Sequence, residues 1–308
     1  MILPILFLIA FLDQSIADDE VFNYGLSVND YGEPVIDPPL PSDVIDAHRR
    51  WIECMNTQGD LDSASTHEIW KGLVNLVDVC GNGDLSNINV SLINGGRDVK
   101  YAILPEKIAD RSVLITIGGA HDTKAEEELK QIFRNDGHHG RKNLLKITGA
   151  DADVEAKEMN YKGLGLYFPF DIANTSEDKH VRELVKGEYV DRTISYINIA
   201  TFILKFATNA FIDYMWIDST GIDYNVLLWF FRDTSMDLSD VFICQLDLIF
   251  HDPSAKERKI IVDFIKTMVN EKRFVLSRAS RKGDDTHLFL INLEKHECVR
   301  RYVQPFFS

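Results

Sequence analysis

Cysteine and positive charge are both scarce in this sequence. Among its 308 residues there are 4 cysteines, and no two of them form a C-x-x-C pair, which argues against a structural zinc site. The formal net charge is −15, the pI is about 5.0, and no run of basic residues offsets that balance locally. The chain is therefore a poor candidate for binding phosphate backbones or anionic membrane surfaces, and we expect no nucleic-acid partner.

Long apolar runs are also missing. The run at residues 2–12 is too short to cross a bilayer comfortably, and we expect no stable transmembrane anchor. Such a run at the start of a chain, followed by the small residues Ser15 and Ala17, is typical of a signal peptide, although no Lys or Arg precedes it. We therefore expect the chain to enter the secretory pathway and to be secreted or held in the lumen of the endoplasmic reticulum or Golgi. An uncleaved anchor is the competing interpretation.

An oxidising compartment affects the interpretation of the cysteines and of two asparagines. Cys54 and Cys80 both lie in the N-terminal helical region, so they are plausible disulfide partners. Cys244 lies inside an apolar strand pattern, and we expect it to be an inert buried thiol. Asn89 and Asn174 each begin an Asn-x-Ser triplet and are candidate N-glycosylation sites, although such triplets also arise by chance.

The sequence patterns divide the chain into four segments. These are a signal peptide at 1–17, an acidic proline-rich lead-in at 18–41, a helical N-terminal flank at 42–99, and an α/β domain at 100–308. Two amphipathic helices are expected in the flank, over 42–55 with Ser42 or Asp43 as the cap, and over 63–79. The flank is either a cap on the main domain or a purely structural appendage, and we prefer the second interpretation.

Strand and helix patterns alternate from residue 100 to the C-terminus. The expected strands are 113–117, 144–147, 166–172, 211–217, 241–250, 273–277 and 287–293. The expected helices are 125–133, 154–161, 197–206, 224–231, 254–270 and one from about 294. Alternation of this kind predicts a doubly wound α/β sheet with helices on both faces. The turn at 281–285 predicts a closing hairpin that adds an antiparallel strand at one edge.

The stretch at 113–134 combines an apolar strand, the pair Gly118-Gly119 and an amphipathic helix. Asp122 or Thr123 can cap that helix. A strand, a glycine turn and a helix N-terminus together suit a nucleotide-like ligand. The third glycine of a full G-x-G-x-x-G pattern is missing, so we assign no pyrophosphate site.

Two aspartates follow other expected strands. Asp151 ends the second strand and Asp218 ends the fourth, and ligands of open α/β sheets bind beyond such strand ends. A carboxylate at each tip fits an adenosine-containing ligand, but Asp in this position also serves as an ordinary helix cap. Asp151 and Asp153 also have the D-x-D form of a metal-dependent nucleotide-sugar transferase, although ribose binding and helix capping explain them better.

The order of these motifs resembles the FkbM-type methyltransferases, a branch of the class I enzymes that depend on S-adenosylmethionine. The resemblance covers about residues 100–300, and its strongest part is DYMWIDSTGIDYNVL at 213–227, which is similar to the family pattern D-x-x-x-x-D-x-E-G-x-E-x-x-x-L. The resemblance implies a Rossmann-like sheet of seven strands with one antiparallel strand. It also implies methyl transfer from S-adenosylmethionine to a hydroxyl of a sugar or small molecule.

The resemblance also implies roles by position. Gly118 and Gly119 would pass under the methionine part of the cofactor, Asp151 would hold the ribose, and Asp171 would lie close to the adenine. Asp218 would face the sulfonium and the acceptor, where a carboxylate balances the charge and can take the hydroxyl proton. The candidate residues are Asp218 and Asp223 for catalysis and Thr116, Gly118, Gly119, His121, Asp151 and Asp171 for cofactor binding, with no metal site.

Three positions depart from the family pattern and support a second hypothesis. Thr116 stands where the family has an acidic residue that holds the cofactor's amino group, Asp122 where it has glycine, and Thr220 where it has glutamate. Asp223 keeps the second acidic position in a shorter form. His121 is a base near the acceptor, a residue that stacks on the cofactor or, as we prefer, a solvated turn residue. The two hypotheses are an active O-methyltransferase and a secreted, catalytically inactive methyltransferase-like binding module.

Overall fold

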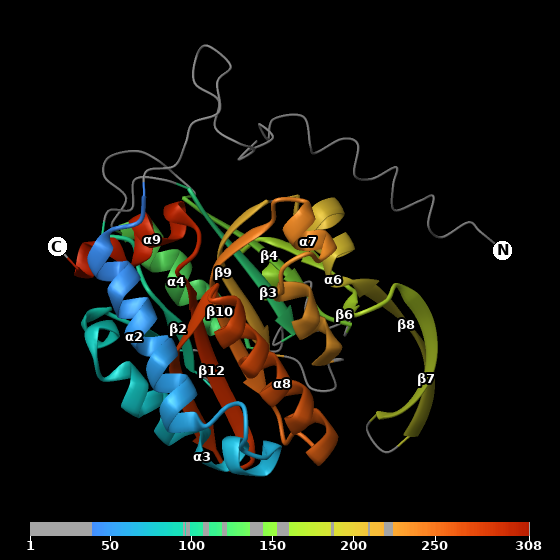
Figure 1. The fold of residues 1–308 in the computed structure, drawn as a ribbon. Coiled ribbons are helices and arrows are strands. Elements are labelled where there is room, and N and C mark those ends of the chain that lie inside the picture. Colours follow the sequence, from blue (N-terminus) through green and yellow to red (C-terminus); the bar gives the residue numbers. More distant parts are fainter. Residues whose placement is uncertain are drawn as a thin grey trace. The chain divides into compact units, whose positions relative to one another are not determined.

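The computed structural model in Figure 1 describes most of the chain from residue 39 onward. The described residues are 39–94, 96, 99–106, 111–118, 122–135, 144–152, 160–185, 188–208, 210–218 and 224–307. The expected signal peptide and the candidate residues Gly119, His121 and Asp223 lie outside them. Across the described part of the chain, none of the helices combines the length and the apolar character needed to cross a membrane.

A sheet of seven strands in the order β11-β12-β10-β9-β3-β4-β5 forms the centre of the fold. Its strands are β3 (Ser112–Gly118), β4 (Leu145–Ala150), β5 (Leu166–Phe168), β9 (Phe211–Asp218), β10 (Phe242–Phe250), β11 (Phe274–Lys282) and β12 (Asp285–Asn292). Neighbouring strands from β10 to β5 are parallel. The chain builds one half of the sheet outward from β3 and the other outward from β9. The predicted mostly parallel α/β sheet is confirmed, and its strand order reverses between β3 and β9.

The central strands form where the sequence is continuously apolar. Along β9 every residue is buried except the last, Asp218, and β10 is buried from Ile243 to Phe250. Strands covered on both faces are expected to lack polar alternation. Each fully buried Leu or Ile side chain in such a strand contributes about 1.5–3 kcal/mol through removal of apolar surface from water. These runs explain why the sequence located β9 and β10 correctly.

The predicted closing hairpin is present at one edge of the sheet, but its antiparallel strand is the second strand from the edge and not the edge strand itself. β12 pairs antiparallel with β10 on one side and with β11 on the other, and β11 forms the edge. Residues 288–291 of β12 are all buried, whereas the last two residues of β11, Arg281 and Lys282, are exposed. The more apolar strand of the hairpin therefore takes the position with a neighbour on each side.

The predicted strand at 166–172 is divided between two sheets. β5 ends at Phe168, and β6 (Asp171–Ala173) joins a separate sheet of the order β6-β8-β7. Pro169 lies between them and carries no N–H for a strand ladder, and the Phe170 N–H donates to the Phe168 carbonyl (2.8 Å).

The strands β7 (Glu177–Val185) and β8 (Glu188–Asn198) were not predicted. They pair antiparallel and form the long ribbon at the right of Figure 1. Their sequences mix charged and apolar residues without a clear alternation, so no strand signal was apparent.

Two predicted helices take other forms. The segment expected to be helical over 197–206 begins with α6 (Ile199–Thr201), capped by the Asn198 side chain, and continues as a π-helical turn, η2 (Phe202–Ala207). The segment expected over 224–231 is a 3₁₀ helix, η3 (Tyr224–Phe230). The remaining elements are η1 (Asp84–Asn87), β1 (Ser91–Asn94), β2 (Val99–Ala102), α4 (Lys124–Asn135), α7 (Ser235–Leu238), α8 (Ala255–Glu271), α9 (His296–Tyr302) and η4 (Gln304–Phe306).

The N-terminal flank contains α2 (Ser42–Gly59) and α3 (Thr66–Gly81), and α3 contacts β11 and α8. The predicted disulfide Cys54–Cys80 is present and joins the two helices. The predicted cap of the first helix was wrong, because Pro41 precedes α2 and no side chain caps it. Ser65 caps α3 in a reciprocal capping box with Glu68, which explains why that helix begins later than predicted.

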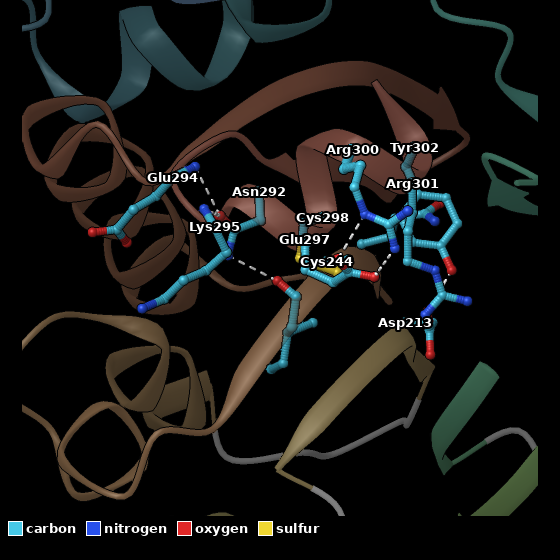
Figure 2. Close-up of a disulfide and its surroundings, with 12 residues drawn as sticks. Asp213, Cys244, Asn292, Glu294, Lys295, Glu297, Cys298, Arg300, Arg301 and Tyr302 are labelled. Carbon is cyan, nitrogen blue, oxygen red and sulfur yellow. Dashed lines mark hydrogen bonds and ion pairs between the residues drawn. A yellow bond between two sulfur atoms is a disulfide. The ribbon is translucent and has the colours of Figure 1, made fainter. Parts of the chain in front are cut away.

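The expectation of a free thiol at Cys244 was also wrong, because Cys244 forms a disulfide with Cys298 (Figure 2). The bond joins β10 to α9. In the same region Asp213 of β9 accepts a hydrogen bond from the Tyr302 hydroxyl (2.5 Å) and pairs with Arg301 (2.8 Å). These contacts hold α9 against the amino-terminal ends of the central strands. Cys298 of α9 lies 54 residues beyond Cys244 in the sequence.

Candidate functional site

The carboxyl ends of β3 and β9 lie side by side where the strand order reverses. Gly118, the last residue of β3, is the register partner of Asp218, the last residue of β9. Gly118 has a φ of 77°, a backbone conformation that residues with a side chain rarely adopt. Glycine therefore suits the point where the chain leaves the strand. Asp151 directly follows β4, the next strand along. The structure thus brings Gly118 and Asp218 together, with Asp151 one strand further away.

Two basic side chains hold the Asp218 carboxylate. Lys100 of β2 forms an ion pair with its Oδ2, and the side chains of Lys100 and Asp218 are only 8% and 15% exposed. On the other oxygen, Nε2 of His251 lies 2.7 Å from Oδ1. His251 follows β10, so residues from three elements meet at this carboxylate. We refer to Lys100, Asp218 and His251 as the Asp218 cluster.

The position of Lys100 is fixed by its own strand. The backbone of β2 binds to side chains of β10: the Tyr101 N–H donates to Asp247 (2.5 Å), and the Ile103 N–H donates to Gln245 (2.7 Å). Gln245 donates back to the Ile103 carbonyl (3.0 Å). β2 also pairs antiparallel with β1, so both edges of the short strand are satisfied. The ammonium group of Lys100 is therefore delivered to Asp218 by an anchored hairpin.

These partners decide the ionisation of Asp218. Burial alone would raise the pKa of Asp218, but the hydrogen bond from His251 and the charge and hydrogen bond of Lys100 outweigh burial and lower the pKa to about 2. A carboxylate with so low a pKa holds a proton weakly. Asp218 is therefore ionised at neutral pH and poorly suited to accepting a substrate proton.

His251 lies between two carboxylates. Its Nδ1 is 3.3 Å from Oδ2 of Asp285, the first residue of β12, and its Nε2 faces Asp218. The hydrogen bond to Asp218 is the main cause that raises the pKa of His251 above its ordinary value. Below that raised pKa the ring carries a proton on each nitrogen, and above it one nitrogen is able to accept a proton.

A second buried carboxyl group lies beside the cluster. Glu126, in the first turn of α4, is 4% exposed and accepts a hydrogen bond from the Thr116 hydroxyl (3.1 Å). The Tyr161 hydroxyl lies 3.1 Å from the same Thr116 oxygen. Burial raises the pKa of Glu126 to about 7, against smaller lowering effects that include the charge of Lys100 and the Thr116 hydrogen bond. Glu126 therefore lies within electrostatic reach of the Asp218 cluster.

The space above β4 is filled by Tyr161. A Cβ atom on Gly149 of β4 would lie 2.4 Å from the Tyr161 ring, so only glycine fits beneath it. Thr116 lies opposite Gly149 in the register of β3 and β4 and is 2% exposed. The Thr116 hydroxyl is therefore hydrogen-bonded within the protein, with Glu126 and Tyr161 as its partners.

The other predicted site residues lie apart from the cluster. Asp151 is partly buried, its N–H donates to the Phe168 carbonyl (3.2 Å) and its carbonyl accepts from the Tyr167 hydroxyl (2.7 Å). Asp171 begins β6 in the smaller sheet and accepts from the Ile172 N–H (3.0 Å). The roles of these two residues, and those of Gly119, His121 and Asp223 outside the described residues, stay predictions.

Sequence reasoning missed Lys100, His251 and Glu126. His251 carried a usable signal, because it is a polar residue directly after a buried parallel strand. Lys100 was visible only as one charge in a short apolar pattern. Glu126 lies in the first turn of the expected helix, where the helix dipole explains a carboxylate equally well, so the sequence gave no indication that its side chain is buried.

A small surface hollow lies at the opposite edge of the sheet, where β10 and β11 begin and β12 ends. Its main charged side chain, Arg273, is paired with Asp237 (2.5 Å) and Glu294 (2.8 Å). Since these charges neutralise each other and ligands of such sheets bind at the carboxyl edge, the Asp218 cluster is the better candidate site.

The comparisons with known proteins do not indicate an activity for this site. No protein-family model matches the chain. The chain is similar to the Caenorhabditis elegans protein named "Uncharacterized protein C28H8.7", with 20% identity over 265 residues, which is 83% of this chain and 80% of that protein. An identity of this size shows no family membership, so the chemistry has to come from the site itself.

Proposed function

We propose that this chain is an S-adenosylmethionine-dependent O-methyltransferase of the FkbM type that acts on a sugar or small-molecule hydroxyl. The observation that carries the proposal is the position of Asp218 at the tip of β9 beside Gly118, at the reversal point of the sheet. A seven-stranded sheet with one antiparallel strand, as the sequence resemblance implies, is consistent with it.

The residues at Asp218 do not fit a sulfonium as they stand. Both carboxylate oxygens already face basic groups, Oδ2 the Lys100 ammonium and Oδ1 the His251 ring. A further cation at Asp218 would meet like charge, so we derive no transfer step through the cofactor. What the cluster itself supplies is a place to hold a proton, because neutral His251 can accept one while Asp218 and Asp285 stabilise the charged ring.

The same ion pair favours a second candidate function, a catalytically inactive methyltransferase-like binding module. In such a protein Asp218 would have no catalytic role, and its ion pair with Lys100 would stabilise the strand ends at which a ligand binds. The buried Thr116 agrees with this candidate, because its hydroxyl is already bound to Glu126.

An experiment that separates the two candidates combines binding with turnover. Labelled S-adenosylmethionine is incubated with the protein and a panel of sugars and small alcohols, and its binding is measured by titration calorimetry. The methyltransferase proposal predicts label in an acceptor and its loss in Asp218→Asn, whereas the control Asp263→Asn, an exposed change on α8, stays active. Binding without transfer to any acceptor would instead support the binding module.

We also propose that the protein folds in the secretory pathway. Its 4 cysteines form the two disulfides Cys54–Cys80 and Cys244–Cys298, which are typical of an oxidising compartment. Asn89 is exposed, whereas Asn174 is partly buried and its Oδ1 accepts from the Trp229 indole N–H (2.7 Å).

The compartment is tested with protein from a secreting eukaryotic host. We expect a glycan at Asn89, so enzymatic removal of N-glycans should increase the gel mobility of the wild type and leave that of Asn89→Gln unchanged. Asn174→Gln is the matched control and should still shift. Unmodified protein with four free thiols would contradict the proposed compartment.

A further inference from the structure

We propose that Arg258 and Arg281 form a binding site for a phosphate monoester group, at the place where α3, α8 and β11 contact one another. Neither arginine belongs to the Asp218 cluster, so the inference does not depend on the proposed methyl transfer. The two residues come from α8 and β11 and are brought together only by the fold. A local basic site of this kind is therefore compatible with a sequence that is acidic overall and contains no basic run.

The two guanidinium groups pack on one aromatic ring. The guanidinium carbon of Arg281 lies 4.8 Å from the centroid of the Trp70 ring, and that of Arg258 lies 5.7 Å from it. Trp70 belongs to α3 and is 7% exposed, so the core fixes its position. Burial and the charge of Arg258 lower the pKa of Arg281 below its ordinary value. An arginine nevertheless stays protonated, so two like charges face each other here in the folded protein.

Hydrogen bonds hold both guanidinium groups in place and use only part of their donors. Arg258 donates from Nε to the Pro253 carbonyl (2.7 Å), which leaves both of its terminal nitrogens. Arg281 donates from Nη2 to the Trp70 carbonyl, which leaves Nε and Nη1. A guanidinium carries five N–H donors in a rigid fork. The remaining donors of both arginines have no acceptor among the residues that the structure describes, and a ligand with several oxygens can satisfy them.

In the described part of the chain, neither Arg258 nor Arg281 forms an ion pair. Acidic residues are not in short supply, because 48 of them face 33 basic ones. Glu257, next to Arg258, and Glu68, near Trp70, are engaged in the capping boxes of α8 and α3. Six other arginines do have carboxylate partners, namely Arg49, Arg50, Arg232, Arg273, Arg300 and Arg301. The unpaired charges at Trp70 therefore favour an anion from solution.

The charge and the donor geometry favour a phosphate monoester over other anions. Two guanidinium groups bring two positive charges, and a phosphate monoester carries about −1.5 to −2 at pH 7. A sulfate ester carries a single negative charge and would leave one arginine uncompensated. Arginine also donates to phosphate oxygens in pairs, which makes such contacts stronger than those between neutral groups. Phosphate is thus the group that neutralises this site.

The test is titration calorimetry of the full chain with phenyl phosphate and with phenyl sulfate at the same ionic strength. We expect saturable binding of phenyl phosphate, and weaker binding of phenyl sulfate. Arg258→Gln and Arg281→Gln should each weaken the binding of phenyl phosphate by about tenfold or more, because each removes charge-assisted hydrogen bonds. Arg49→Gln, at an exposed arginine that has carboxylate partners, is the matched control and should leave the affinity unchanged.

A second measurement needs no variant. Phenylglyoxal modifies accessible arginines, and phenyl phosphate should protect Arg258 and Arg281 of the wild type from it but not Arg49, as read by peptide mass spectrometry. This result decides the inference even if Arg281→Gln fails to fold. No saturable binding of phenyl phosphate at millimolar concentration would overturn the inference. Equal or tighter binding of phenyl sulfate, or an unchanged affinity in both arginine variants, would also overturn it.

Discussion

A half-buried carboxyl group, Asp218, and a fully buried one, Glu126, influence each other electrostatically in this protein and ionise in opposite ways. Asp218, at the end of β9, has its pKa lowered to about 2, whereas Glu126, at the start of α4, has its pKa raised to about 7. Burial pushes both pKa values upward. The difference lies in the partners, because Asp218 contacts the basic side chains of Lys100 and His251 and Glu126 contacts the neutral hydroxyl of Thr116.

The comparison shows that burial alone does not set the charge of a site. A hydroxyl donor satisfies one oxygen of a carboxylate but does not compensate the lost hydration of a full charge. A basic partner does, and it converts a costly buried group into a stable anion. The region around Asp218 is therefore ionic at neutral pH, and the region around Glu126 is near its point of titration.

The largest effect on the contrast between Asp218 and Glu126 is expected when the cation that pairs with Asp218 is removed. Lys100→Met leaves a shielded carboxylate with His251 as its remaining basic partner, and we expect a loss of about 2–4 kcal/mol in unfolding free energy at pH 7. Because the folded pKa of Asp218 lies below its ordinary value of 3.8, this stabilisation is present above that pH and is lost as the pH falls toward 2. Urea unfolding at pH 7 and pH 2.5 measures both effects.

The exposed change Lys256→Met is the control for that experiment and should alter the stability by less than about 0.5 kcal/mol. The double variant Lys100→Met/Asp218→Asn should lose less than the sum of the single variants, because neither charge is then left alone. Additive losses would contradict a direct interaction between the two side chains.

The second prediction uses the opposite sign of the Glu126 shift. Glu126→Gln removes the cost of an ionised buried group, so we expect a gain of about 1–3 kcal/mol at pH 8. A carboxyl pKa raised from 4.5 to about 7 favours folding below pH 4.5, and this advantage is lost as the pH rises through 7. The difference between variant and wild type should therefore vanish near pH 4.5.

Urea unfolding at the two pH values checks this prediction. Glu127→Gln, at an exposed neighbouring position in α4, supplies the matched control and should show little change at either pH. Loss of stability at pH 8 in Glu126→Gln would mean that the ionised carboxylate is favourable and that the contrast with Asp218 is false.

A smaller effect on stability is expected when the hydroxyl that donates to Glu126 is removed. Thr116→Val keeps the shape of the side chain but removes the donor to Glu126 and the partner of the Tyr161 hydroxyl, which should cost about 1 kcal/mol at pH 8. It should also raise the pKa of Glu126 further, which nuclear magnetic resonance of the labelled carboxyl carbon can follow. A pKa that does not move would show that the hydroxyl has no influence on this carboxyl group.

The smallest change in stability is expected at His251, which is partly exposed. His251→Asn removes the hydrogen-bonded ring from Asp218, and we expect a loss below about 1 kcal/mol at pH 6 together with a rise in the pKa of Asp218. Carboxyl resonance titration between pH 1.5 and pH 5 measures the pKa directly. If the pKa stayed near 2, Lys100 alone would account for the ionisation of Asp218.

The sequence by itself determined the parts that depend on neighbouring residues. The continuous apolar runs of β9 and β10 predicted buried parallel strands, and Ser254 with Glu257 marks the start of α8 through a capping box. The tips of β3 and β9 followed from the order of these elements, and the bond between Cys54 and Cys80 followed from the place of both cysteines in the N-terminal helical region. These predictions rest on local pattern, on nearness in the sequence, or on the rule that parallel strands end at one edge.

Tertiary structure alone decided which charges meet. Lys100 and Asp218 are 118 residues apart, and only the binding of β2 to side chains of β10 brings the ammonium group to the carboxylate. The pairing of Cys244 with Cys298 likewise depends on where α9 lies. An ion pair or a disulfide requires side chains at contact distance, and contact between distant segments is a property of packing that no local pattern encodes.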